Sequence, residues 1–342
     1  MNRLAEIFVH SFAVVCAGLV LGIPILAAAY DTNDLWLEMA LNYYPVQTNY
    51  FVSTNHNAVR TNRYVTQTYD SASFILHPPA TNADGMYDLY FKTNLLTAGD
   101  WTWLKRSFPG KTNFVISNLP PVHGLFRLGV TNAVRSGVCS NVLAANDDGS
   151  TDLVPLGFYI NFYGSSNDAV YVNNNGDVTF DSPVSEYTPK TLITLGVEVI
   201  APFWADVDTR NPDSDVVRYG ANKVDGHDAF VVNWVNVGYY NSKADRLLSC
   251  QLVLINRSDI APGDFDMEFN YDKVQWQWGD VTENDPPRAG FANNGGGYEL
   301  PGSGIEGAFM DTNEVSGLIY YCANSAVPGR YFFRFRDGLP QF

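Results

Sequence analysis

The chain has 342 residues, of which 46% are hydrophobic and 14% aromatic, and its formal net charge is −15. This composition supports packed cores and argues against a disordered chain, and the length allows two domains of ordinary size. An acidic chain without a basic cluster repels phosphate backbones and anionic lipid surfaces, which argues against nucleic acid as a partner.

The first 29 residues have the pattern of a secretory signal peptide. Arg3 precedes an apolar run at residues 7–26, and three alanines at residues 27–29 supply the small side chains that a signal peptidase needs. A retained transmembrane anchor is the alternative, since the run is near the roughly 20 residues that span a bilayer. A lipoprotein acylated at Cys16 is disfavoured, because apolar residues continue after it. The leader therefore predicts export, with no membrane span after cleavage.

Residues 30–135 have the pattern of a small all-β module. Thr-Asn dipeptides recur here, and threonine favours strands whereas asparagine favours turns. Residues 30–69 are polar and rich in turn signals, which predicts an N-terminal arm that is partly flexible. Five short strands are predicted after the arm, at residues 72–76, 86–91, 102–105, 113–116 and 124–128.

A domain boundary is predicted within residues 131–152. The segment 146–152, N-D-D-G-S-T-D, offers oxygen atoms of the kind that calcium binds. It fails the spacing of an EF-hand loop, however, because Ala144 stands where a carboxylate would be needed. A solvated linker is therefore the preferred interpretation of this segment.

Residues 136–342 are predicted to form a second β domain. Apolar runs at residues 170–172 and 178–180 are separated by N-N-N-G-D, whose Asn-Gly pair supplies the positive φ of a tight hairpin. Residues 229–237 are apolar on both faces, which is typical of a strand in the middle of a sheet. The predicted fold class is all-β, with two β-sandwich-like domains after the signal peptide.

The stretch 199–210, V-I-A-P-F-W-A-D-V-D-T-R, reads as a buried strand that ends in an acidic corner. In an extended segment Asp206 and Asp208 point to the same side. We expect them to accept hydrogen bonds from turn amides, or from Arg210 or Arg288, and binding of a metal ion by the two aspartates is the alternative. A glycosidase pair is disfavoured, because such carboxyls face each other across a cleft.

Residues 264–272 alternate between acidic or polar and apolar side chains. Phe265 and its period-two partners face the core, which leaves an acidic stripe on the other face. A solvated surface is the preferred interpretation of this stripe, and a surface for calcium or a basic partner is the alternative. The stripe consists of Asp264, Asp266, Glu268, Asn270 and Asp272.

Two polar loops follow, at residues 279–288 and 293–297, and binding contacts tend to lie in such loops. Aromatic residues near them could stack on sugars or anchor a protein partner, and the alternative is that these side chains are buried in the core. The candidates are Trp276, Trp278, Tyr239, Tyr240 and Tyr298.

The segment 201–209, A-P-F-W-A-D-V-D-T, resembles the signature of the nidogen-like (NIDO) extracellular domain. Further segments fit this family in the same order, at residues 156–164, 170–180, 229–237, 251–255 and 288–291. The family occurs in basement-membrane and cell-surface proteins, so the resemblance implies a role in cell–matrix adhesion and no established chemistry.

Cys139 and Cys322 lie at the two ends of the NIDO-like region. An oxidising compartment favours a disulfide between them, and two unpaired thiols are the alternative. Cys250 lies in a strand-like run, where a free cysteine behaves as a small buried hydrophobe.

The sequence contains neither an H-E-x-x-H pair nor a G-x-S-x-G elbow. We therefore predict a non-catalytic adhesion protein, secreted or at the cell surface, that binds an extracellular protein or glycan. No cofactor is certain, and calcium is the one that the acidic segments could accept. The alternative is a lectin or glycosidase that uses the aromatic loops with Asp206 and Asp208.

Overall fold

The computed structural model describes residues 36–48, 64–77, 87–92, 102–107, 113–117, 125–129, 132–137, 139–279 and 285–342. Two compact units make up the chain, Met1–Thr131 and Asn132–Phe342. The described residues form β-strands, with one short 3-10 helix and no α-helix, which confirms the all-β prediction. None of them forms a helix that could cross a membrane. The predicted signal peptide lies outside the described residues.

The first unit contains two three-stranded antiparallel sheets, ordered β1-β2-β5 and β4-β3-β6. All five predicted strands are confirmed to within two residues, except that β2 begins earlier. The strands are β1 (Trp36–Thr48), β2 (Tyr64–His77), β3 (Asp88–Lys92), β4 (Thr102–Arg106), β5 (Asn113–Ser117) and β6 (Leu125–Gly129).

Within the predicted polar arm at residues 30–69, residues 36–48 and 64–69 form strands. Strand β1 pairs with β2 along its whole length, from Trp36 opposite His77 to Thr48 opposite Tyr64. The two strands of a long hairpin form backbone hydrogen bonds with each other, so polar side chains do not prevent the strands from pairing.

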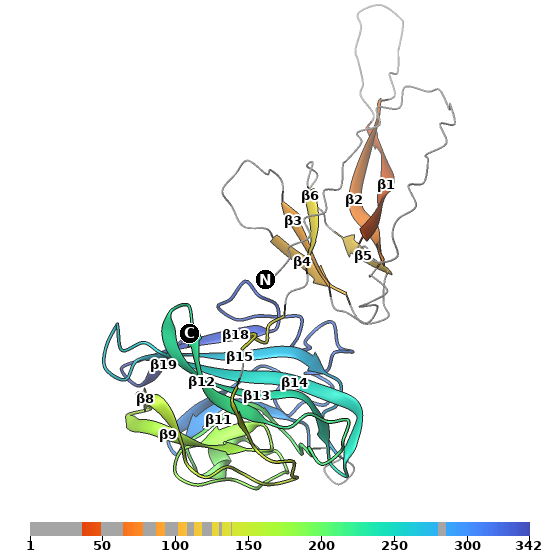
Figure 1. Cartoon of the computed structure of the whole chain (residues 1–342). Helices are drawn as coiled ribbons and strands as arrows, with labels where there is room; N and C mark the ends of the chain where they lie inside the picture. Colours follow the sequence, from red (N-terminus) through yellow and green to blue (C-terminus); the bar gives the residue numbers. More distant parts are fainter. Residues whose placement is uncertain are drawn as a thin grey trace, which may run out of the picture. The chain divides into compact units, whose positions relative to one another are not determined.

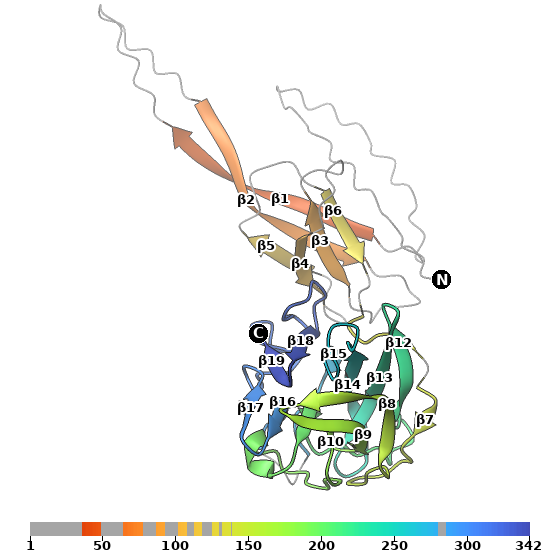
Figure 2. The same cartoon turned by 90° about the vertical axis from the view of Figure 1, so that its left-hand side faces the viewer.

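The second unit is a sandwich of two antiparallel sheets (Figures 1 and 2). One sheet has the order β17-β16-β11-β10-β9-β8 and the other β19-β18-β15-β14-β13-β12-β7. The elements are β7 (Asn141–Val142), β8 (Val154–Phe162), β9 (Ser165–Asn173), β10 (Asp177–Thr179), η2 (Leu192–Leu195), β11 (Val199–Trp204), β12 (Arg218–Val224), β13 (His227–Tyr239), β14 (Lys243–Asn256), β15 (Phe265–Val274), β16 (Arg288–Asn293), β17 (Gly296–Glu299), β18 (Arg330–Arg336) and β19 (Leu339–Gln341).

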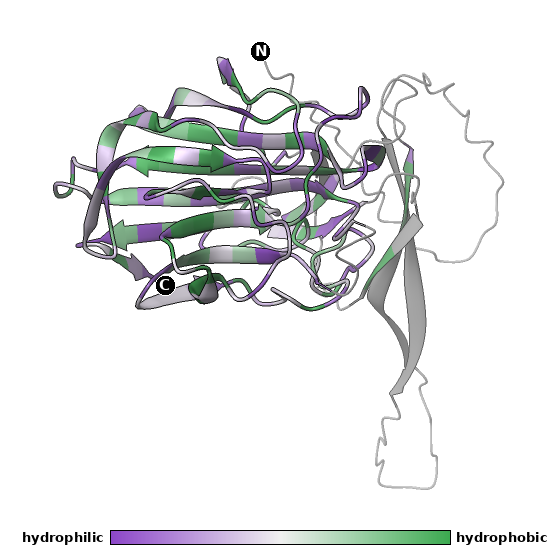
Figure 3. Ribbon diagram, turned by 90° about the horizontal axis from the view of Figure 1, so that it is seen from below, coloured by the Kyte–Doolittle hydropathy of each residue, from purple (hydrophilic) through white to green (hydrophobic). Residues whose placement is uncertain are grey.

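Aromatic side chains fill the space between the two sheets. The rings of Phe162 on β8 and Phe291 on β16 lie 5.5 and 5.2 Å from that of Phe335, which belongs to the other sheet. Phe335 also stacks on Phe265 at 4.6 Å. Burying a phenylalanine side chain contributes roughly 1.5–3 kcal/mol, so this cluster is a main source of stability. Hydrophobic and hydrophilic residues alternate along many of these strands (Figure 3).

The predicted hairpin and the predicted central strand are both confirmed. Strands β9 and β10 pair with Asp177 opposite Asn173, and Gly176 in the turn has a φ of 87°. A Cβ atom on Gly176 would lie 1.8 Å from the carbonyl oxygen of Phe203, so only glycine fits this turn. Strand β13 lies between β12 and β14, inside its sheet.

The acidic stripe is buried except at Asp272, which is half-buried, so neither interpretation holds for the other four residues. Asp266 and Glu268 are only 3% and 1% exposed. Arg257 and Arg336 contact the two oxygens of Asp266 at 2.8 and 2.6 Å. Arg135 donates two hydrogen bonds of 2.7 Å to Glu268. These four residues are therefore neither solvated nor open to calcium or a partner, because arginines of the same chain cover them.

Residues 132–137 hold Arg135 in place. The Ala133 amide donates to Asp272 at 2.6 Å, and the Arg135 amide donates to Gln251 at 3.0 Å. Burial raises the pKa of Glu268, but the hydrogen bonds from Arg135 and the charges of both Arg330 and Arg135 outweigh it, so the pKa is lowered overall. Folding therefore favours the charged form of this carboxyl.

We expect Glu268→Gln to destabilise the protein by about 2–4 kcal/mol at pH 7. The substitution leaves Arg135 and Arg330 without their counter-charge in a largely buried place, and the 26% exposure of Arg135 keeps the loss below that of a fully buried pair. Urea midpoints measure it, and the deficit should shrink as the pH falls through the ordinary range of glutamate.

Asp228→Asn is the control for this change, because it removes an acid whose pair with Lys223 is exposed. Its urea midpoint should stay at the wild-type value. Equal midpoints for the two variants would contradict the stabilising role of the covered stripe.

A second buried acid, Asp177, lacks a cation. Its pKa is raised to about 7 by burial, and the hydrogen bond from Asn173 offsets this only in part. No described group donates a hydrogen bond to its Oδ2 atom. The folded protein therefore binds this proton more tightly than the unfolded chain does.

The contribution of Asp177 to stability should consequently fall as the pH rises from about 4 to about 7. We expect Asp177→Asn to be more stable than the wild type at pH 8, by on the order of 4 kcal/mol, and about equally stable near pH 4. Melting temperatures across this range measure the difference. A variant that keeps the wild-type pH dependence would rule out Asp177 as its source.

Candidate metal centre

Asp206 and Asp208, the two predicted aspartates, lie just after the end of strand β11. Its six residues are all buried, and its pairing with β16 is interrupted between Ala201 and Trp204. Pro202 has no N–H to donate, so regular pairing cannot continue there. The Phe203 amide instead donates to the carbonyl oxygen of Gly176 at 3.2 Å. The chain then leaves the sheet, and Asp206 and Asp208 follow.

Asp208 is bound within the corner. Its carboxylate accepts hydrogen bonds from the Arg210 amide and side chain, both at 2.9 Å, and from the Ser242 amide at 2.7 Å. Burial raises the pKa of Asp208, but these hydrogen bonds and the Arg210 charge lower it overall. The expected role in fixing the turn is therefore confirmed for Asp208. Binding of a metal ion by Asp206 and Asp208 together stays a prediction.

Asp206 has other surroundings than Asp208. Its side chain is 1% exposed, and no described group donates a hydrogen bond to its Oδ2 atom. Burial raises its pKa to about 7, with further contributions from the charges of Asp147, Asp148 and Asp208. Asp206 is thus a buried acid whose neighbours are also acids.

Two of those neighbours lie in the segment 146–152, which is a structured loop and not the predicted solvated linker. The Gly149 amide donates to the side chain of Asn146 at 2.6 Å, which forms a tight turn. The Asn146 amide donates to the Thr209 hydroxyl at 2.9 Å, and the Thr209 amide donates to the carbonyl oxygen of Asn146 at 2.9 Å. The loop is thereby held against the segment that carries Asp206.

The hairpin between β9 and β10 fixes this loop from the other side. The Asn174 amide donates to the carbonyl oxygen of Gly149 at 2.9 Å. The side chain of Asn175 donates to Asp148 at 2.9 Å and accepts from the Val207 amide at 3.1 Å. One asparagine therefore joins the acidic loop to the end of β11.

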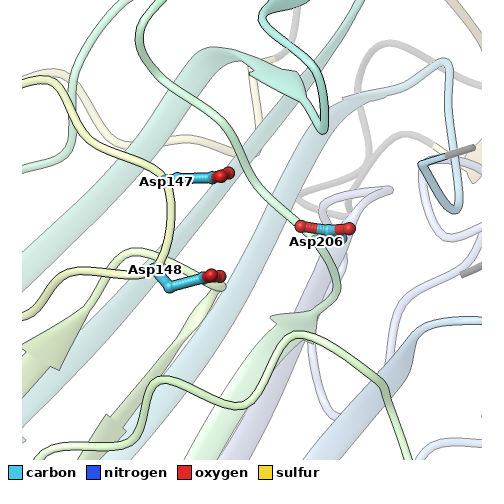
Figure 4. A group of neighbouring side chains, drawn as sticks. All are labelled: Asp147, Asp148 and Asp206. Atoms are coloured by element: carbon cyan, nitrogen blue, oxygen red, sulfur yellow. The ribbon is translucent and has the colours of Figure 1, made fainter. Parts of the chain in front are cut away.

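Three carboxylates converge as a result. Asp147 and Asp148 point from their loop toward Asp206 (Figure 4). One oxygen atom from each of the three lies within 4.8 Å of the others. Oδ1 of Asp147, like Oδ2 of Asp206, receives no hydrogen bond from a described group. Such a cluster of oxygen atoms could hold a hard divalent cation.

The predicted aromatic candidates separate into two sets. Trp276 and Tyr239 are 0% and 2% exposed and their rings lie 5.5 Å apart, so they belong to the core and are not available to a ligand. Trp278, Tyr240 and Tyr298 are partly exposed. The Tyr240 amide donates to the carbonyl oxygen of Asp206 at 3.1 Å, which places Tyr240 beside the acidic cluster.

The predicted disulfide is not formed. Cys139 is a buried free thiol that accepts a hydrogen bond from Asn233 at 3.2 Å, whereas Cys322 is an exposed free thiol. Cys139 packs against Val231 and Val253 on the outer face of its sheet. Cys250 is also free and fully buried, as predicted.

Known proteins resemble part of this chain. Mouse and human alpha-tectorin are each 31% identical to this chain over 226 aligned residues, and Drosophila melanogaster nidogen is 30% identical over 220. The alignments cover 55%, 55% and 56% of this chain but only 10%, 10% and 15% of those proteins, so the chain spans a small part of their length. No solved structure matches the chain significantly.

The NIDO-related family matches residues 131–306, which include the hairpin, β11 and all three carboxylates of the cluster. This match covers half of the chain, and it coincides with most of the second unit. The chain belongs to the NIDO-related family.

Proposed function

We propose that this protein is a secreted or cell-surface adhesion protein that binds an extracellular protein or glycan and catalyses no reaction. The observation that carries the proposal is the NIDO-related match to residues 131–306. The relatives alpha-tectorin and nidogen are extracellular matrix proteins, which supports a location outside the cell.

The geometry of the acidic corner also favours binding over catalysis. A glycosidase needs two carboxyl groups that flank the bond to be cleaved. Asp206 is buried, and Asp208 is held by Arg210 and Ser242, so these two do not form such a pair. Of the carbohydrate-active alternatives, a lectin therefore fits better than a glycosidase.

The ligand would meet the end of the sandwich that carries Tyr240 and Trp278. A Cβ atom on Gly279 would lie 2.4 Å from that of Tyr240, so Tyr240 is in contact with the residue that follows Trp278. Both aromatic side chains are partly exposed. Neighbouring aromatic groups of this kind can stack on sugars or anchor a protein.

A binding experiment with the full chain tests the proposal. We expect saturable binding to a plate coated with extracellular-matrix extract or to a glycan array. The double variant Tyr240→Ser/Trp278→Ser should bind at least about tenfold more weakly, because truncation of aromatic anchors typically costs 1–2 kcal/mol or more.

Tyr159→Ser is the matched control, because Tyr159 lies on β8 and is 55% exposed. It should bind as the wild type does. Hydrolysis of any polysaccharide by the chain, or a lack of saturable binding to both surfaces, would overturn the proposed function.

A further inference from the structure

Buried acids in this protein are commonly matched by arginine. Asp88 pairs with Arg106 at 2.9 Å, and the covered acids of β15 pair with arginines at 2.6 to 2.8 Å. Removing a carboxylate from water is costly unless a positive charge compensates for it. In the cluster of Asp147, Asp148 and Asp206, only Asp147 pairs with an arginine of the described residues.

Arg210 pairs with one member of the cluster, Asp147, at 2.9 Å. It binds Asp208 and the Oδ2 atom of Asp147. Oδ1 of Asp147 and Oδ2 of Asp206 receive no hydrogen bond from any group in the described part of the chain. Asp206 is 1% exposed, so its carboxyl group is shielded from bulk water. The three converging carboxylates therefore include a buried oxygen, Oδ2 of Asp206, that has no hydrogen-bond partner among the described groups.

We propose that Asp147, Asp148 and Asp206 bind a calcium ion. The cluster offers oxygen atoms alone, which suits calcium or magnesium and not zinc or copper. Calcium accepts oxygens at about 2.3–2.6 Å, so two ligands on opposite sides of it are about 4.6–5.2 Å apart. The oxygens of the cluster lie within 4.8 Å of one another and satisfy this limit.

Hydrogen bonds from neighbouring residues fix the conformation of the loop that carries Asp147 and Asp148. Asn175 holds Asp148, Asn174 holds the backbone of Gly149, and Thr209 holds Asn146. A preorganised loop loses less conformational entropy when it binds. The ion would join residues 147 and 148 to the segment after β11, beside Tyr240. This site does not depend on the adhesive role proposed above.

Melting curves of the full chain test the proposal. After treatment with EDTA, the protein is measured in 0 to 10 mM CaCl₂, with MgCl₂ at the same concentrations and NaCl at matched ionic strength. Extracellular calcium modules bind with a Kd of about 0.1–1 mM, so we expect 10 mM calcium to raise the melting temperature by about 3–6 °C. Terbium luminescence excited through the tryptophans, and its displacement by calcium, gives a second readout.

Asp206→Asn should abolish both the calcium shift and the terbium signal. The variant removes a buried charge and keeps the shape of the side chain, so it should remain folded. Asp148→Asn, at the partly exposed end of the cluster, should weaken both responses. Asp152→Asn is the control, because this exposed acid lies in the same segment but outside the cluster; it should respond as the wild type does.

Three results would overturn the calcium site. They are an unchanged wild-type melting temperature with no terbium signal, a calcium response that survives in Asp206→Asn, and a magnesium response as large as that to calcium. Failure of the matrix-binding experiment together with a normal calcium shift would refute the adhesive role alone.

Discussion

The geometry of the second unit depends on the contact between the β9–β10 hairpin and the end of β11. Gly176 lets the backbone of Phe203 approach so closely that a larger residue would overlap its carbonyl oxygen. The Trp234 indole donates to the carbonyl oxygen of Asn174 at 3.0 Å, which ties the hairpin to the opposite sheet. Asn175 then contacts both Asp148 and Val207. A single turn thus positions the loop, the corner and the core relative to one another.

The same turn explains why neighbouring aspartates have different roles. In a regular strand Asp206 and Asp208 would share a face. The Val207 amide donates to the carbonyl oxygen of Ala205 at 2.9 Å, so the chain bends between them and is not extended. Asp208 then meets Arg210, whereas Asp206 is placed under the acidic loop. Opposite pKa shifts follow from these two surroundings.

Much of the fold was predictable because local patterns decide it. Alternating residues identified β15, the Asn-Gly pair identified the hairpin, and short apolar runs identified the strands after residue 72. Strand β1 was missed although Leu37, Met39 and Leu41 alternate with other residues, since turn signals nearby masked that period. The acidic stripe was misinterpreted for another reason. Its arginine partners lie as many as 133 residues away along the chain, and no local pattern indicates that distance.

The candidate metal centre also depends on contacts between residues that are far apart in the sequence. The segment with Asp147 and Asp148 has calcium-type ligands but not the spacing of an EF-hand, and the sequence pattern pairs Asp206 with Asp208 as an alternative metal site. An EF-hand draws its ligands from one continuous loop, so its spacing is visible in the sequence. Here the ligands come from two segments about 60 residues apart, and asparagines of a third segment bring them together. The signal that could have joined them is the presence of buried acids without a matching arginine, and that becomes visible only once the folded chain shows where each arginine goes.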